Sequence, residues 1–337
     1  MSKLENSIGW CDDTGNKVIG CDKASPGCKN CYAEIGTIAR VMRSRAVNPV
    51  ETWGPKGTRI PVGDFTAKLK RLNRLCICDK CHETQPAERV GQECGMLPKG
   101  VYLADLECTG RLRHIRLFAD SNSDWLDARW GAPVLAEFLV EICAAPNVDV
   151  LLLTKRLDRF SKAMRDVVIL ADQNGMSQAA IIADNWTSGK PPANVWLGAS
   201  VENQECADDR ILDLLCTPAA IRFLSCEPLL EDVDIQSALG RNIGCNDAMA
   251  DKDCVECAHL AKPVDWIIVG GESGKHRRDC GIGELRDVIR QVTDAGVPVY
   301  VKQDCAFKSG QQGRIPDEAW RLKQFPETNI QHSTPNT

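Results

Sequence analysis

Three cysteines near the amino terminus are the residues whose type and spacing most clearly suggest chemistry. Cys21 is followed by a Ser25-Pro26-Gly27 turn, and then by Cys28 and Cys31 with two residues between them. The turn lets the backbone double back, so the three thiolates are expected to converge on a soft metal centre. A structural zinc ion needs four protein ligands, and Cys11 is the nearby residue that could supply the fourth. A 4Fe-4S cluster held by three cysteines instead leaves one iron open for a substrate or cofactor.

The chain contains 18 cysteines in all, which in a reducing compartment indicates metal binding more than disulfides. One further set consists of Cys76, Cys78, Cys81 and Cys94, with Cys108 further along the chain. Its spacing resembles half a zinc ribbon, so it predicts a site for zinc or for a second iron-sulfur cluster. Another set is either a separate site or the completion of that one; it consists of Cys245, Cys254 and Cys257. Cys143 and Cys216 lie in apolar helical stretches and are expected in the core, whereas Cys280 and Cys305 fit no predicted site.

The elements that must position these residues follow a repeated pattern of a short apolar run, a polar cluster and a helical stretch. The apolar runs lie at 115–118, 148–153, 195–197, 221–224, 266–269 and 297–301, and a run at Val18-Ile19 is expected to be the first strand, delivering the cysteines. Such runs indicate buried parallel strands with helical crossovers. We therefore predict an α/β fold, an incomplete (β/α) barrel spanning residues 1–330. Cys-rich insertions are expected at 62–112 and 236–264, and a flexible tail at 325–337.

Polar residues at the ends of these strands should meet at one mouth of the barrel, where parallel barrels carry their active sites. The candidate catalytic residues are Lys155, Glu202, Glu227, Glu272 and Lys302. Buried charges are costly unless they are paired or used, so the alternative is a network of salt bridges that stiffens the barrel.

Several motifs resemble a poorly characterised phage and prophage protein family related to the radical S-adenosylmethionine (radical SAM) enzymes. The cysteine loop is similar to a radical SAM cluster loop, with the longer first gap of six residues that is normal in this family. The motifs are Gly20-Cys21 through Tyr32-Ala33, Leu153-Thr154-Lys155-Arg156, Asn194-Val195-Trp196-Leu197-Gly198, Ser200-Val201-Glu202-Asn203, Ser225-Cys226-Glu227-Pro228-Leu229-Leu230 and Asp265-Trp266 leading to Gly270-Gly271-Glu272-Ser273-Gly274.

The resemblance implies a TIM-like partial barrel of the radical SAM type and an enzyme with a 4Fe-4S cluster on Cys21, Cys28 and Cys31. The open iron would chelate S-adenosyl-L-methionine, and an electron donor would then allow its cleavage to a 5′-deoxyadenosyl radical. Candidate residues for binding this cofactor are Tyr32, Ser200, Glu202, Gly270 and Gly271. Superfamily members use a Gly-Gly-Glu segment for this purpose, although here the segment follows a later strand.

The charge distribution is compatible with binding of a polyanion on one face, and the alternative is a solvated loop region rich in Lys and Arg. The net charge is −5, yet residues 40–116 hold 15 Lys and Arg against 8 Asp and Glu. With the phage association, this favours a nucleotide or nucleic-acid substrate and DNA hypermodification. One alternative is a zinc-stabilised nucleic-acid-binding protein without radical chemistry. A metal-dependent hydrolase is disfavoured, because none of the five histidines follows a predicted strand.

The amino-terminal residues are polar and no apolar run is long enough to cross a bilayer, so we expect a cytoplasmic protein without membrane contact.

Overall fold

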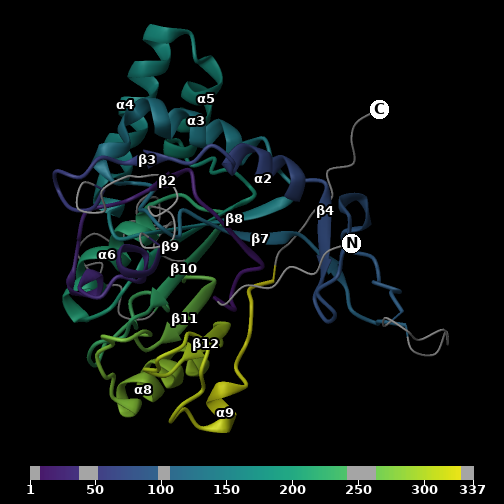
Figure 1. The fold of residues 1–337 in the computed structure, drawn as a ribbon, viewed down its shortest axis with the longest axis vertical. Coiled ribbons are helices and arrows are strands. Elements are labelled where there is room, and N and C mark those ends of the chain that lie inside the picture. The colour runs from purple at the N-terminus through teal and green to yellow at the C-terminus, as the bar shows by residue number, and fades with distance from the viewer. Residues whose placement is uncertain (1–7, 38–51, 98–106, 241–262, 328–337) are drawn as a thin grey trace, which may run out of the picture.

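The computed structural model describes residues 8–37, 52–97, 107–240 and 263–327, and it is built around an open sheet of seven strands (Figure 1). All seven pair in parallel in the order β1-β7-β8-β9-β10-β11-β12. The strands are β1 (Asp13–Gly15), β7 (Ile115–Ala119), β8 (Val148–Thr154), β9 (Val195–Ser200), β10 (Ile221–Cys226), β11 (Trp266–Gly270) and β12 (Val299–Gln303). The sheet curls into a half-barrel, in agreement with the predicted α/β class and incomplete barrel.

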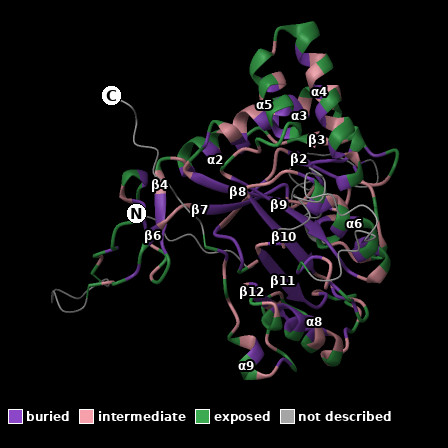
Figure 2. Cartoon of the chain, turned by 180° about the vertical axis from the view of Figure 1, so that it is seen from behind, coloured by how far each residue is buried: buried purple, intermediate pink, exposed green. Residues whose placement is uncertain are grey.

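Helices connect the strands and cover the convex face of the sheet, with their exposed sides outward (Figure 2). The crossover helices are α3 (Gly131–Cys143), α4 (Phe160–Asn174), α5 (Ser177–Thr187), α6 (Gln204–Cys216) and α8 (Ile282–Asp294). The short turns and helices are η1 (Pro26–Cys28), η2 (Ala33–Thr37), α2 (Phe65–Leu72), η4 (Ala87–Arg89), η6 (Ala128–Trp130), η7 (Leu157–Arg159) and α9 (Asp317–Trp320). No helix in the described ranges is long and apolar enough to span a bilayer.

Side-chain alternation along each strand produces two cores. On β8, Val150 and Leu152 join the cluster under the helices, whereas Leu151 joins a second cluster on the concave face. The second cluster is aromatic: the rings of Trp196 and Trp266 lie 6.0 Å apart, edge to face. This interior is packed, so any site at the barrel must lie at the ends of the strands.

The first strand of the sheet differs from the predicted one. Asp13–Gly15 pairs with β7, whereas the predicted run Val18-Ile19 forms β2 (Val18–Ile19) and pairs antiparallel with β3 (Ile60–Pro61). Val18 and Ile19 are buried, which explains their apolar character, but burial does not determine which strand the backbone joins.

The carboxyl-terminal prediction is also corrected at Phe325, which was expected to begin the flexible tail. Its ring packs 5.3 Å from that of Trp266, and the guanidinium of Arg116 lies 3.8 Å above it. A single aromatic anchor carries no periodicity, so the pattern did not reveal it. Residues 328–337 lie outside the described ranges.

A small antiparallel sheet stands beside the barrel, in the order β5-β4-β6 (Figure 1). Its strands are β4 (Leu75–Cys78), β5 (Thr84–Pro86) and β6 (Leu112–Arg113). Helix α2, which lay inside the predicted insertion at 62–112, instead buries Phe65, Leu69 and Leu72 in the main core. Most of the other predicted insertion, residues 241–262, lies outside the described ranges.

Candidate metal centres

The segment from Cys21 to Tyr32, here called the cysteine loop, is tied to the carboxyl end of β7. The backbone N–H of Asp22 donates to Asp127 at 2.9 Å, and the Tyr32 hydroxyl donates to the carbonyl of Ser121 at 2.7 Å. Just before the loop, the N–H of Gly20 donates to the carbonyl of Asn122 at 3.0 Å. The loop therefore lies at the mouth of the barrel, as predicted.

Charged residues after β8 and β9 hold the first half of the loop. Arg156 donates to the carbonyl of Asp22 at 2.6 Å. Glu202, fully buried, accepts from the Ser25 hydroxyl and pairs with Lys155 at 3.1 Å and Arg210 at 2.9 Å. Burial acts to raise the pKa of Glu202, but Lys155 and Arg210 outweigh it and hold the pKa below its usual value. Glu202 is thus an ionised anchor for the turn.

Glu272, after β11, holds the second half. Its Oε2 accepts from the Asn30 amide at 2.9 Å, and its Oε1 accepts from Arg278 at 2.7 Å. Arg278 also donates to the carbonyl of Pro26 at 2.9 Å, and Asn30 to the carbonyl of His276 at 2.7 Å. The hydrogen bonds from Arg278 and Asn30 outweigh the effect of burial and lower the pKa of Glu272.

The three thiols of the cysteine loop are close but do not form a compact single-ion site. Burial is the main reason that the pKa of Cys21 is raised, and its neighbours Cys31 and Cys28 raise it further. In the described ranges, groups of three or more ligand atoms within 4.8 Å of one another do not include these sulfurs. Three thiolates are a soft donor set that suits a 4Fe-4S cluster with one open iron, or a zinc ion completed by a fourth ligand.

The remaining predicted charges form a separate pair at the mouth. Lys302 donates to Glu227 at 2.5 Å, and their side chains are 10% and 15% exposed. Neither residue makes a described hydrogen bond to the cysteine loop, in contrast to Glu202 and Glu272. Glu227 also accepts from the Gln303 amide at 3.4 Å, so the pair is held by the end of β12.

Four of the five candidate cofactor-binding residues lie at strand ends, Ser200 and Glu202 at β9 and Gly270 and Gly271 at β11, whereas Tyr32 lies in the cysteine loop. Ser200 is buried, and its carbonyl accepts from Arg210 at 2.8 Å. Gly270 adjoins Lys302, and a Cβ added to it would lie 3.3 Å from the Lys302 Cβ. A Cβ on Gly271 would lie 2.5 Å from the Cys305 sulfur, so glycine is required there for packing.

The second metal centre is a compact group of four cysteines on the small sheet. The sulfurs of Cys78, Cys81, Cys94 and Cys108 all lie within 4.8 Å of one another. The Cys78–Cys108 and Cys81–Cys94 pairs are each 3.6 Å apart. A zinc tetrahedron with Zn–S bonds of about 2.3 Å has edges of about 3.8 Å, so the group has the geometry of a four-cysteine zinc site.

Local backbone geometry supports this site. The N–H groups of Lys80 and Cys81 point at the Cys78 sulfur at 3.4 and 3.5 Å, which orients and stabilises a thiolate. A Cβ on Gly110 would lie 2.4 Å from the same sulfur, so only glycine fits there. The chain thus closes tightly around Cys78.

The predicted ligand set for this centre requires one correction. Cys76 is not part of the group, and its thiol lies 3.1 Å from the carbonyl of Pro86. Two residues along a strand correspond to about 6.6 Å, so Cys76 lies too far down the same face to reach an ion held by Cys78. Cys108 is instead the fourth member of the group. The other predicted ligands, Cys245, Cys254 and Cys257, lie outside the described ranges.

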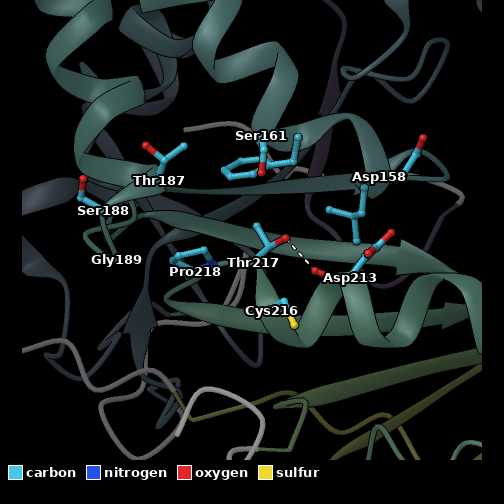
Figure 3. Close-up of a pocket in the computed structure, with 11 residues that line it drawn as sticks. Asp158, Ser161, Thr187, Ser188, Gly189, Asp213, Cys216, Thr217 and Pro218 are labelled. Atoms are coloured by element: carbon cyan, nitrogen blue, oxygen red, sulfur yellow. Dashed lines mark hydrogen bonds between the residues drawn. The ribbon is translucent and has the colours of Figure 1, made fainter. Parts of the chain in front are cut away.

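A hollow of about 430 Å³ lies elsewhere, between η7, α4 and the ends of α5 and α6 (Figure 3). Asp158 and Asp213 line it, and burial followed by the charge of Asp158 raises the pKa of Asp213. Cys216, which was expected in the core, is exposed and lines the same hollow. None of the predicted site residues lines it.

Sequence reasoning did not predict which residues fasten the cysteine loop. These are Ser25, Asn30, Arg156, Arg210 and Arg278. The sequence did carry a signal for two of them, because Ser25 and Asn30 lie between the cysteines of the predicted metal-binding loop. Arg210 lies on the helix after β9 and became recognisable only through its contact with Glu202.

Comparison with known proteins places the chain in a family without assigning an activity. Residues 5–324 match the family described as "Protein of unknown function (DUF5131)", so the chain belongs to this family. No curated protein and no solved structure matches the chain significantly.

Proposed function

We propose that this chain is a radical SAM enzyme whose 4Fe-4S cluster is held by Cys21, Cys28 and Cys31. The observation that carries the proposal is the position of the cysteine loop across the mouth of a parallel half-barrel, fastened by residues that follow β7, β8, β9 and β11. A loop held from four strand ends can keep three sulfurs in place without a fourth protein ligand.

The protein's own residues would position and shield the reacting groups. When bound, a reduced cluster supplies one electron that cleaves S-adenosylmethionine to a 5′-deoxyadenosyl radical, which takes hydrogen from the substrate. Glu202 and Glu272 act as positioning residues, since they hold Ser25 and Asn30. The Glu227–Lys302 pair offers both a hydrogen-bond acceptor and a cation to the bound cofactor or substrate.

A nucleotide or nucleic-acid substrate, as in phage DNA hypermodification, is supported by the charge at the mouth. Lys275, His276 and Arg277 are exposed on the loop that follows Glu272. The His276 carbonyl accepts from Asn30, so the flanking cations Lys275 and Arg277 lie beside the cysteine loop. Exposed cations next to the reacting centre suit the phosphates of such a substrate.

The enzymatic part is tested by anaerobic reconstitution with iron and sulfide, followed by dithionite as the electron donor and S-adenosylmethionine. We expect 5′-deoxyadenosine from the wild type and none above background from Cys28→Ala, which should retain the zinc of the small sheet. Equal product from both proteins, or none from either, would contradict the proposal.

The substrate part is tested by the salt dependence of DNA binding, followed by fluorescence anisotropy. Replacing Lys275 and Arg277 by alanine should lower the slope of log affinity against log salt by about two, because about one unit is lost with each phosphate contact. Lys162→Ala with Lys190→Ala, which removes two exposed cations elsewhere, should leave the slope unchanged. Equal slopes for the two double variants would contradict a phosphate site at the mouth.

A second candidate, a zinc-stabilised nucleic-acid-binding protein, is favoured by the separate four-cysteine sheet. Helix α2 contacts β4 and presents Lys70 and Arg71 to solvent, with Arg74 just beyond it. This function predicts DNA binding that is lost on removal of zinc, with no cleavage of S-adenosylmethionine. The product assay therefore separates the two candidates.

A further inference from the structure

Two cysteines that fit no predicted site lie together at the ends of β11 and β12. The sulfurs of Cys280 and Cys305 and a carboxylate oxygen of Asp304 lie within 4.8 Å of one another. The backbone N–H of Cys280 donates to the Cys305 sulfur at 3.0 Å. Both sulfurs press on Gly271, where an added Cβ would lie 2.5 Å from one and 3.0 Å from the other.

The surroundings of Asp304 argue against a three-ligand metal site. Arg314 donates to Asp304 from its backbone N–H, its Nε and its NH2 group, each at 2.8 Å, and the N–H of Cys305 donates at 2.6 Å. These four hydrogen bonds occupy the lone pairs of the carboxylate, so within the described ranges the pair of sulfurs has no free third ligand.

The two sulfurs differ in solvent exposure, and this difference indicates which of them can react first. Cys280 is buried at 1% exposure, whereas Cys305 is partly exposed. The hydrogen bond from the Cys280 thiol lowers the pKa of Cys305. The backbone N–H of Cys280 lowers it further, while burial acts in the opposite direction. Cys305 is therefore the accessible sulfur with a stabilised thiolate, and Cys280 lies behind it.

We propose that Cys305 and Cys280 form a thiol-disulfide exchange site that reacts with a small-molecule disulfide such as oxidised glutathione. The Cys305 thiolate attacks one glutathione sulfur, forming a mixed disulfide and releasing one glutathione thiolate. Cys280 then loses its proton to solvent and attacks the Cys305 sulfur, which forms the Cys280–Cys305 bond and releases the second glutathione. One oxidised glutathione is reduced for each protein disulfide formed.

The site adjoins the anchor of the cysteine loop, because Gly271, against which the Cys305 sulfur packs, directly precedes Glu272, whose carboxylate holds Asn30. Oxidation converts the Cys305 thiolate into a neutral disulfide sulfur. The exchange itself requires no cluster, so this inference stands independently of the proposed radical chemistry.

The test is peptide mapping of the full-length, metal-loaded protein after anaerobic incubation with oxidised glutathione and alkylation of the remaining thiols. We expect a Cys280–Cys305 disulfide in the wild type. In Cys280→Ser we expect glutathione trapped on Cys305 at least tenfold faster than on Cys143, whose pKa burial raises to about 11. In Cys305→Ser, Cys280 should react no faster than Cys143.

Three results would overturn the assignment. The wild-type mapping does not depend on either variant folding, and absence of the Cys280–Cys305 bond there would contradict the exchange site. A Cys305 that reacts no faster than Cys143 in Cys280→Ser would remove its role as the attacking sulfur. A metal ion retained by the wild type and lost in Cys280→Ser would identify the pair as metal ligands instead.

Discussion

The amide of Asn30 donates to Oε2 of Glu272 at 2.9 Å, although 242 residues separate them in the chain. This bond joins the centre of the cysteine loop to the carboxyl end of β11. The same oxygen also accepts from the N–H of Arg278 at 2.7 Å, so the anchor is itself held in place. The relationship gives Glu272 a positioning role that its place at the end of a strand did not reveal.

Loss of this contact should loosen the cysteine loop and destabilise the fold. For Asn30→Ala we expect the iron of the reconstituted protein to be lost to a chelator at least tenfold faster. The free energy of unfolding should fall by about 2–4 kcal/mol, because Asn30 loses one hydrogen bond to the Glu272 carboxylate and one to the His276 carbonyl. Asn174→Ala removes one exposed hydrogen bond to a carbonyl on α4, should cost about 1 kcal/mol and serves as the control. An unchanged rate of iron loss would argue against the anchoring role.

Removal of the Glu202 carboxylate should destabilise the whole protein. In Glu202→Ala, Lys155 and Arg210 lose their shared buried partner, and breaking such a pair costs about 3–5 kcal/mol. The measurement is the free energy of unfolding in urea. Asp166→Ala, which breaks the exposed pair with Lys162, should cost no more than about 1 kcal/mol. Similar losses in the two variants would show that the Glu202 pairs are not structural.

Asp120 should make folding stability depend on pH around neutrality. Burial is the main reason that its pKa is raised to about 8, and its Oδ2 is a buried atom without a hydrogen-bond partner. In the unfolded chain the pKa is about 3.9, so between these values the folded state binds more protons. Stability contributed by the protonated form is therefore present below about pH 4 and is lost as the pH rises towards 8.

The slope from this single group can reach about 1.4 kcal/mol per pH unit. Asp120→Asn resembles the protonated carboxyl and should flatten the decline in stability between pH 5 and 8, measured by urea unfolding at each pH. Asp166→Asn, an exposed carboxylate, should not. A decline of the same slope in Asp120→Asn would exclude Asp120 as its source.

Cys76 and Cys108 give a sharp test of the zinc ligands. Cys108→Ser should lower the zinc content by one ion per chain or weaken its retention strongly, because one of four thiolates is lost. Cys76→Ser changes a cysteine of the same strand face outside the tetrahedron and should retain the ion. Zinc would be measured by elemental analysis after dialysis against a chelator. Retention by Cys108→Ser with loss in Cys76→Ser would restore the ligand set expected from spacing.

The sequence carried enough information to predict the sheet but not all of its connections. Six apolar runs became the parallel strands β7 to β12, because buried parallel strands are apolar on both faces. The first strand was misplaced, since Asp13–Gly15 is short and polar and is held by pairing with β7 and by hydrogen bonds from Lys68. The packing of Phe325 on Trp266 was also missed, because a single buried ring produces no periodic pattern of apolar residues.

The sequence predicted where the candidate site lies better than it predicted what each of its residues does. The pattern of strand ends placed Glu202, Glu227 and Glu272 at one mouth, but it could not indicate which carboxylates hold the loop. That depends on partners such as Ser25 and Asn30, whose distances are set by the folded backbone. The spacing of the cysteines likewise identified three of the four that form the group beside the small sheet. Cys108 is too far along the sequence for its spacing to predict that it joins them.

The most direct test of the central claim is electron paramagnetic resonance of the reduced, reconstituted protein with and without S-adenosylmethionine. If Cys21, Cys28 and Cys31 leave one iron open, the wild type should show a 4Fe-4S signal whose g values shift when the molecule is added, and Cys28→Ala should show none. A cluster signal that S-adenosylmethionine leaves unchanged, or a protein that takes up zinc and no iron at this loop, would contradict the account.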